Sequence, residues 1–193
     1  MIPKRIGPIS QNSKLPRRLF RALVPKDDGS WTANDEPLPF LRHLYSISGI
    51  PRPDSNAHDG YALTKAVHAK AIPLIRFLLA HGADPGTKNG LAVMVAIRRK
   101  DINLVKMLVE RADEVTKGKR RRLRDRVVVT NEMLRMAVKC DARDIVQYFR
   151  EEKGVIPDLK TLNTLPGSLV LPTVPLSIAP NAIADSPLKR KRR

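Results

Sequence analysis

The chain has 193 residues and a formal net charge of +17, with 36 lysines and arginines against 19 acidic residues. This length allows one domain of about 100–120 residues flanked by tails. The single cysteine, Cys140, cannot form an internal disulfide, which excludes a disulfide-stapled fold and favours a reducing compartment.

Residues 1–36 are predicted to form a basic, disordered tail. The part from Met1 to Lys26 resembles a mitochondrial transit peptide, because it is basic throughout and has no acidic residue. Against this interpretation, Pro3, Pro8 and Pro16 interrupt any long amphipathic helix. The seven basic residues are Lys4, Arg5, Lys14, Arg17, Arg18, Arg21 and Lys26.

Residues 37–53 are expected to cap the N-terminal end of the domain. Leu38, Leu41 and Leu44 lie three apart, as on one face of a short helix, and Gly49 stands where a helix cap is expected. Such a unit would shield the apolar face of the element that follows.

The segment from Ala66 to Asp84 recurs in pattern at Ala96 and again at Ala137. Within each copy the apolar residues fall three and four apart, which predicts two short helices. Neighbouring copies are expected to stack, because a helix pair of this size cannot bury its apolar face alone. The positions that coincide are Ala66, Ala96 and Ala137; Leu74, Leu104 and Ile145; Ile75, Val105 and Val146; and Leu78, Leu108 and Phe149.

This register also predicts where the helices begin and end. Pro73 fits the first turn of a helix, and Gly82 fits a left-handed cap. With only eight Phe, Trp and Tyr residues, the chain is expected to have an aliphatic core. The first helices are expected over residues 62–70, 92–100 and 133–140, and the second helices begin near Ile72, Ile102 and Arg143.

Several of these motifs resemble the ankyrin repeat: LLAHGAD at Leu78 to Asp84, the helix start at Leu63 to Ala66, and the turn at Asn89 and Gly90. The helix starts YALTKA, LAVMVA and EMLRMA depart from the family's pattern. The resemblance implies an all-α, ankyrin-like helix-pair solenoid within residues 37–165, monomeric, between disordered N- and C-terminal tails. Its repeats would lie near 54–88, 89–116 and 130–157.

In the ankyrin family, the first helices and the protruding fingers line the concave surface that binds partners. The resemblance therefore implies a protein-binding surface here. The partner-binding candidates are the residues at the ends of the first helices: His58, His68, Ala69, Arg98, Arg99 and Lys139.

A basic insert at residues 117–129 enlarges the second finger. Ala66 and Ala96 are 30 residues apart, whereas Ala96 and Ala137 are 41 apart. The insert would attract an acidic protein segment, phosphoinositide head groups or nucleic acid phosphates; alternatively, it is a solvated loop or a nuclear import signal. No aromatic residue lies among its cations, so no base-stacking platform is expected. The cations are Lys117, Lys119, Arg120, Arg121, Arg122, Arg124 and Arg126.

After the third repeat, a capping helix is expected at residues 158–165, with Asp158 as its cap and Leu159, Leu162 and Leu165 as its apolar face. Residues 166–193 read as a Pro-rich, extended tail, and their prolines make a membrane span unexpected. The basic cluster that follows resembles a nuclear localisation signal, and Ser186 beside it resembles a proline-directed phosphorylation site. The cluster consists of Lys189, Arg190, Lys191, Arg192 and Arg193.

No motif in the sequence indicates catalysis. None of the four histidines has a Cys, Asp or Glu at ligand spacing on the same helix face, and no phosphate-binding loop, nucleophile elbow or paired carboxylate motif is present, so no cofactor or metal is expected. The sequence thus predicts a non-enzymatic adaptor in the nucleus that binds a protein with an acidic surface. The alternative is a chromatin- or RNA-associated protein that contacts phosphates without sequence specificity, and the alternative locations are the cytoplasm or the mitochondrion.

Overall fold

The computed structural model describes residues 13–26, 30–49, 51–111, 114–116, 119–121 and 124–162, with the backbone alone at 114–116 and 119–121. This part of the chain is helical apart from one short hairpin, so the all-α prediction is confirmed with that addition. The elements are η1 (Arg17–Phe20), α1 (Leu38–Ser46), α2 (Ala57–Ala69), α3 (Ile72–Ala80), α4 (Thr87–Arg98), α5 (Ile102–Val109), β1 (Glu114–Thr116), β2 (Lys119–Arg121), α6 (Asn131–Lys139), α7 (Arg143–Gln147), η2 (Tyr148–Glu152) and α8 (Leu159–Leu162).

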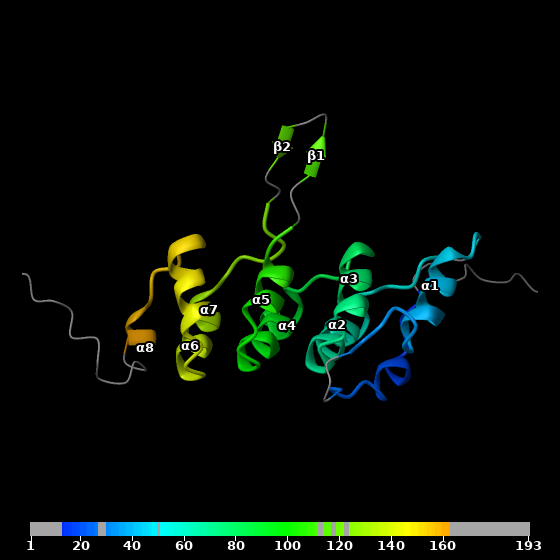
Figure 1. Ribbon diagram of the computed structural model, residues 1–193, viewed down its shortest axis with the longest axis horizontal. Coiled ribbons are helices and arrows are strands. Elements are labelled where there is room, and N and C mark those ends of the chain that lie inside the picture. Colours follow the sequence, from blue (N-terminus) through cyan, green and yellow to red (C-terminus); the bar gives the residue numbers. More distant parts are fainter. Residues whose placement is uncertain are drawn as a thin grey trace, which may run out of the picture.

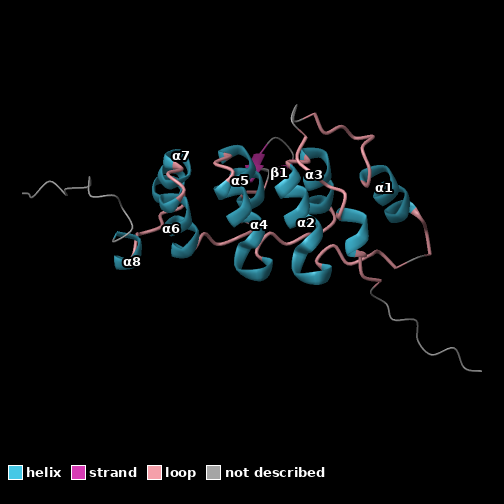
Figure 2. Ribbon diagram, turned by 90° about the horizontal axis from the view of Figure 1, so that it is seen from below, coloured by secondary structure: helices cyan, strands magenta, loops and turns pink. Residues whose placement is uncertain are grey.

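Three helix pairs stand side by side in a row (Figures 1 and 2). The pairs are α2 with α3, α4 with α5, and α6 with α7 and the π-helical turn η2. The first helices pack directly on one another, α2 against α4 and α4 against α6, while α1 and α8 lie at the two ends of the row. The second helices begin at Ile72, Ile102 and Arg143, as the sequence predicts.

The core repeats from pair to pair in the register that the sequence predicts. Ala66, Ala96 and Ala137 are fully buried, and their small side chains let the first helices approach closely. Leu78, Leu108 and Phe149 are likewise fully buried in the second helices. The third pair is therefore as well packed at this position as the other two, although its second helix begins with Arg143, where the other two begin with Ile72 and Ile102.

Each first helix ends in the same reversal. Lys70, Lys100 and Asp141 adopt left-handed backbone conformations with φ of 57°, 53° and 50°. The next amide in each copy donates to the buried alanine carbonyl five residues earlier, at N···O distances of 3.0, 3.3 and 3.0 Å. This Schellman-type cap turns the chain back into the second helix, and it forms here without glycine.

The starts of the first helices differ between the copies. In α2 and α4, three successive residues have positive φ, at residues 58–60 and 88–90, before the regular helix begins. In α6 the hydroxyl of Thr130 instead accepts a hydrogen bond from the Met133 amide at 3.4 Å. Gly60 is required for packing as well, because a Cβ there would lie 2.1 Å from Oγ1 of Thr87 in the next pair.

The prediction of a disordered tail over residues 1–36 is wrong for residues 13–26 and 30–36. Leu15, Phe20 and Leu23 are 3%, 1% and 3% exposed in the core, and η1 packs against α2. Trp31 Nε1 donates to the Ala69 carbonyl at 2.9 Å. The prediction failed because it rested on the high positive charge of this segment, whereas a few apolar residues between the cations anchor the segment in the core. Residues 1–12 lie outside the described part.

The two end helices fulfil the capping predictions unequally. Leu38 and Leu41 of α1 are buried, as expected. Asp158 caps α8 by accepting from the Thr161 amide at 2.8 Å, but Thr161 is the buried residue, whereas Leu159 and Leu162 are 78% and 43% exposed. The predicted apolar face is therefore wrong for these two leucines. Leu165 and residues 166–193 lie outside the described part.

Candidate partner-binding site

Three of the predicted partner-binding residues occupy equivalent places on the first helices. His68, Arg98 and Lys139 lie in the last turns of α2, α4 and α6, and all three are exposed. We call these three residues the platform row. Arg99, also exposed, donates a hydrogen bond to the His68 carbonyl and thus links neighbouring helix ends.

The structure does not bring the remaining two candidates into this row. Ala69 is 1% exposed, so its prediction as a contact residue is corrected: its side chain faces the core, and Trp31 covers its carbonyl. His58 is exposed but lies at the opposite end of α2, within the left-handed turn.

An antiparallel hairpin, with β1 just before the basic insert and β2 within it, projects away from the row of helices (Figure 1). In its register, Glu114 pairs with Arg121, Val115 with Arg120 and Thr116 with Lys119. Among the other predicted cations of the insert, Arg124 is exposed and Arg126 is partly buried at the base. Lys117 and Arg122 lie outside the described residues.

The insert and the platform row lie at opposite ends of the first helices. The insert leads into the N-terminus of α6 at Asn131, whereas Lys139 closes that helix eight residues later, about 12 Å away along its axis. A ligand that contacts both regions must therefore span the height of the repeat.

An ionic cluster fixes the base of the insert. Lys153, whose side chain is 5% exposed, pairs with Glu110 at 3.0 Å and with Asp125 at 2.9 Å. Glu110 directly follows α5 and Asp125 precedes Arg126, so one ammonium group from the third pair holds the chain on both sides of the hairpin. The Arg126 amide completes the closure by donating to the Val109 carbonyl at 2.7 Å.

Tyr148 joins this cluster and affects its protonation. Its hydroxyl donates to Glu110 Oε1 at 2.9 Å, and burial and this bond raise the pKa of Tyr148. Burial alone would raise the pKa of Glu110, but hydrogen bonds from Lys153 and Tyr148 hold it below its ordinary value. For Lys153, burial opposes the hydrogen bonds to Asp125 and Glu110, which prevail and raise its pKa. Near neutral pH, Glu110 and Lys153 are therefore charged, whereas Tyr148 keeps its proton and donates the hydrogen bond.

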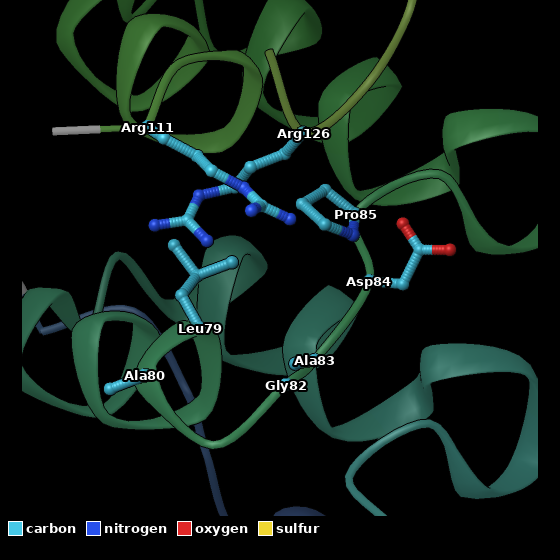
Figure 3. A pocket seen from close by; sticks show the side chains of 8 residues that line it. All are labelled: Leu79, Ala80, Gly82, Ala83, Asp84, Pro85, Arg111 and Arg126. Carbon is cyan, nitrogen blue, oxygen red and sulfur yellow. The ribbon is translucent and has the colours of Figure 1, made fainter. Parts of the chain in front are cut away.

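A pocket of about 590 Å³ lies beside the base of the insert, facing the end of α3. Figure 3 shows the side chains of Arg111 and Arg126 crossing each other over Leu79, with Pro85 at the edge. Arg126 is held in place by a hydrogen bond from its Nε to the Glu110 carbonyl at 3.3 Å. The lining residues are Leu79, Ala80, Gly82, Ala83, Asp84, Pro85, Arg111 and Arg126.

Two arginines and one aspartate, Asp84, bring charge to this pocket. No acidic side chain within the described ranges forms an ion pair with Arg111 or Arg126. The Asp84 carboxylate lies beyond Pro85 in Figure 3 and accepts from the Gly86 amide at 2.8 Å. Burial and the neighbouring Arg111 lower the pKa of Arg126, as expected for two cations close together. Such a pocket favours an anion.

Sequence reasoning identified Arg126 but missed Arg111. The signal was present, because Arg111 lies three residues after Leu108, as His81 lies three after Leu78. Arg111 therefore marks the end of a second helix, and it lies six residues before the basic insert at residues 117–129. Its pairing with Arg126 depends on how the insert closes, which the sequence does not reveal.

No protein-family model matches the chain, and neither a curated protein nor a solved structure is significantly similar to it. In the described ranges, no helix is long and apolar enough to cross a membrane. The same ranges hold no group of three or more His, Cys, Asp or Glu side chains placed to bind a metal ion. Ser186 and the basic cluster from Lys189 to Arg193 lie outside the described residues.

Proposed function

We propose that the chain is an ankyrin-like helix-pair solenoid that acts as a non-enzymatic adaptor, binding an acidic segment of another protein. The observation that carries this proposal is the pocket at the base of the insert, where Arg111 and Arg126 meet without acidic partners among the described residues. Electrostatic attraction by the basic hairpin would speed association, and the pocket would slow dissociation.

The composition of the pocket supports a protein ligand. Leu79, Ala80 and Pro85 provide an apolar floor beside the two guanidinium groups. An acidic peptide carries both kinds of group, since an apolar side chain next to a carboxylate would contact this floor while the carboxylate pairs with an arginine. The platform row adds a second, more distant contact for a longer partner.

A second candidate function is binding to nucleic acid phosphates, and the hairpin is the observation that favours it. Lys119, Arg120 and Arg121 form one strand of a projecting two-stranded ribbon. A ribbon of this kind fits the major groove of a duplex, and its cations would contact phosphates of any sequence.

Affinity capture with the full chain separates the two functions. The tagged protein is incubated with cell extract at low and at moderate salt, with and without nuclease. The matched variants are Arg111→Gln with Arg126→Gln, which removes two cations from the pocket, and Arg120→Gln with Arg121→Gln, which removes two from the hairpin. The control is Arg150→Gln, an exposed cation in η2.

The adaptor proposal expects specific proteins that survive nuclease and are lost with the pocket variant. Captured material that disappears with nuclease and depends on the hairpin variant instead would support the nucleic acid alternative. Capture that is equal for wild type and both double variants would contradict both functions.

We further propose that the protein acts in the nucleus, on the basis of the cluster from Lys189 to Arg193. Deleting residues 189–193, together with neutralising the insert, should move a fluorescent fusion out of the nucleus. An unchanged nuclear signal would contradict this location, and mitochondrial accumulation that depends on residues 1–26 would replace it.

A further inference from the structure

The two arginines of the pocket are arranged as a pair of hydrogen-bond donors. Arg126 is anchored through its backbone amide and its Nε, so its terminal nitrogens remain for a ligand. Arg111 is exposed, and its side chain crosses that of Arg126 over the same floor (Figure 3). Each guanidinium group presents a planar fork that can bind two oxygen atoms of one anion.

The charge of the pair selects among anions. A phosphate monoester carries about −1.5 to −2 at neutral pH and has three terminal oxygens, which matches two cationic forks. A nucleic acid phosphodiester carries one negative charge and has two free oxygens, so it satisfies one fork and leaves the other unpaired. A carboxylate likewise carries one negative charge and two oxygens, so it too leaves one guanidinium group unpaired. The pair therefore favours a monoester over either alternative.

The surroundings of the pair indicate which kind of molecule carries the monoester. Leu79, Ala80, Ala83 and Pro85 line the pocket next to the cations, and they suit apolar residues that flank a phosphorylated side chain. None of the eight lining residues is aromatic, so a nucleobase would find no stacking partner among them.

We propose that Arg111 and Arg126 form a binding site for a phosphorylated serine or threonine in the protein partner. This inference rests on the proposed adaptor function, and it specifies the partner as a phosphoprotein. The site would make binding conditional on a kinase, because the unphosphorylated segment would leave both guanidinium groups unpaired.

Calorimetric titration of the full chain tests the site with defined probes. The central probe is a short peptide with one phosphoserine between leucines, compared with the same peptide carrying serine or glutamate. Inorganic phosphate, single-stranded RNA and phosphatidylcholine vesicles containing a phosphoinositide distinguish the other sources of phosphate. We expect the phosphoserine peptide to bind at least about tenfold more tightly than every other probe.

The variants separate the site from general charge. Arg111→Gln and Arg126→Gln should each weaken phosphopeptide binding at least about tenfold. Arg150→Gln removes one exposed cation elsewhere and should leave it unchanged within about twofold. Arg111→Lys keeps the charge but loses the fork, so its affinity should lie between those of wild type and Arg111→Gln. Because Arg111 is exposed, its variants test the site even if Arg126→Gln perturbs the fold.

The pH dependence gives an independent readout. Lowering the pH from about 7.5 to about 5.5 protonates the phosphate monoester, whose second pKa is about 6, so the affinity should fall. The glutamate peptide should show no comparable loss over this range.

Equal affinity for the serine and phosphoserine peptides, or equal weakening by Arg150→Gln, would overturn the phosphate site. Tighter binding to RNA or to the phosphoinositide vesicles would overturn the assignment to a phosphoprotein. If the phosphate site fails while nuclease-resistant protein capture still depends on the pocket, the adaptor function stands and only this inference is lost.

Discussion

The two connections between the helix pairs are held in different ways. The first, His81–Gly86, is short and is fastened by neutral side chains of the preceding pair: Asn56 donates to the Gly82 carbonyl at 3.1 Å and accepts from the Asp84 amide at 2.7 Å. The second, Glu110–Thr130, is long and projects as a hairpin, and an ammonium group of the following pair, that of Lys153, fastens its base.

This difference shows how a row of packed helices can carry an insert. A short loop closes through local hydrogen bonds and adds little exposed chain. Closing a long loop costs conformational entropy. Here the ion pairs of Lys153 with Glu110 and Asp125, which we call the clamp, offset that cost at the base of the insert. The base, with Arg111 and Arg126, is thus fastened to the row, while the hairpin backbone projects away from the helices (Figure 1).

Truncation of the shared core should destabilise both connections and the whole row. Leu78→Ala and Leu108→Ala each remove a fully buried side chain and should lower the free energy of unfolding by about 2–5 kcal/mol. Chemical denaturation measures this change, with exposed Leu159→Ala as the control. A loss of only a few tenths of a kcal/mol for either core variant would contradict the register of the repeats.

Two glycine substitutions separate the energetic cost of a steric clash between the first and second pairs from the cost of a strained backbone. Gly60 and Gly82 both have positive φ, 69° and 82°, but only at Gly60 would a Cβ collide with a neighbour, Oγ1 of Thr87. Gly82→Ala should cost about 1–2 kcal/mol from the left-handed conformation. Gly60→Ala should cost about 1–3 kcal/mol more, from overpacking.

Denaturation curves of the two glycine variants give this difference directly. Adding Thr87→Ala to Gly60→Ala should recover part of the additional loss, because it removes the colliding hydroxyl. Equal destabilisation by the two single substitutions would show that the pairs are not in close contact at Gly60.

Removing the clamp should loosen the second connection more than the first. Lys153→Met removes the ion-pair partner of Asp125 and of Glu110, which keeps its hydrogen bond from Tyr148. Both carboxylates are about a third exposed, so the cost should be about 1–3 kcal/mol rather than that of a fully buried pair. Hydrogen exchange of the Arg126 amide should accelerate, while that of the Asp84 amide should not. The control is Arg143→Met, which breaks an exposed pair with Asp141 outside the cluster and should cost less than about 1 kcal/mol.

Acid should weaken the same clamp by a smaller amount. The folded-state pKa of Glu110 is lowered, so its contribution is present above the unfolded value of about 4.5 and is lost as the pH falls through the folded pKa. Between about pH 5 and pH 3, the stability of wild type should therefore fall more steeply than that of Glu110→Gln. Parallel pH profiles of the two proteins would contradict the role of Glu110 in the clamp.

The sequence predicts the parts of this structure that depend on local periodicity. The apolar spacing places Leu78 and Leu108 in the core, and Pro73 at the start of α3, because each depends on residues of one helix. The buried segment around Phe20 was missed, since its contacts lie on α2, far along the chain. The clamp at Lys153 and the closeness of Arg111 to Arg126 were missed for the same reason. Both bring together residues that are at least 15 positions apart in the sequence.

The left-handed caps at Lys70, Lys100 and Asp141 were missed for a different reason. Lysine has no preference for positive φ, and aspartate adopts it less readily than glycine, so the residue types alone do not mark these three positions. Their equivalence appears once the three copies are superposed in register. The hairpin of the insert escaped prediction as well, because its short strands contain mostly cations rather than β-branched residues.

The central claim, that the base of the insert binds a protein, is tested most directly by site-specific photo-crosslinking in cells. A photoreactive side chain replaces Ala80, an exposed residue that lines the pocket, and in a control protein it replaces Leu159, which is exposed in α8. We expect a nuclease-resistant protein adduct from position 80 that is absent from position 159 and is lost when Arg111→Gln and Arg126→Gln are added. Adducts that are nucleic acid, or protein adducts equally strong from both positions, would contradict the account.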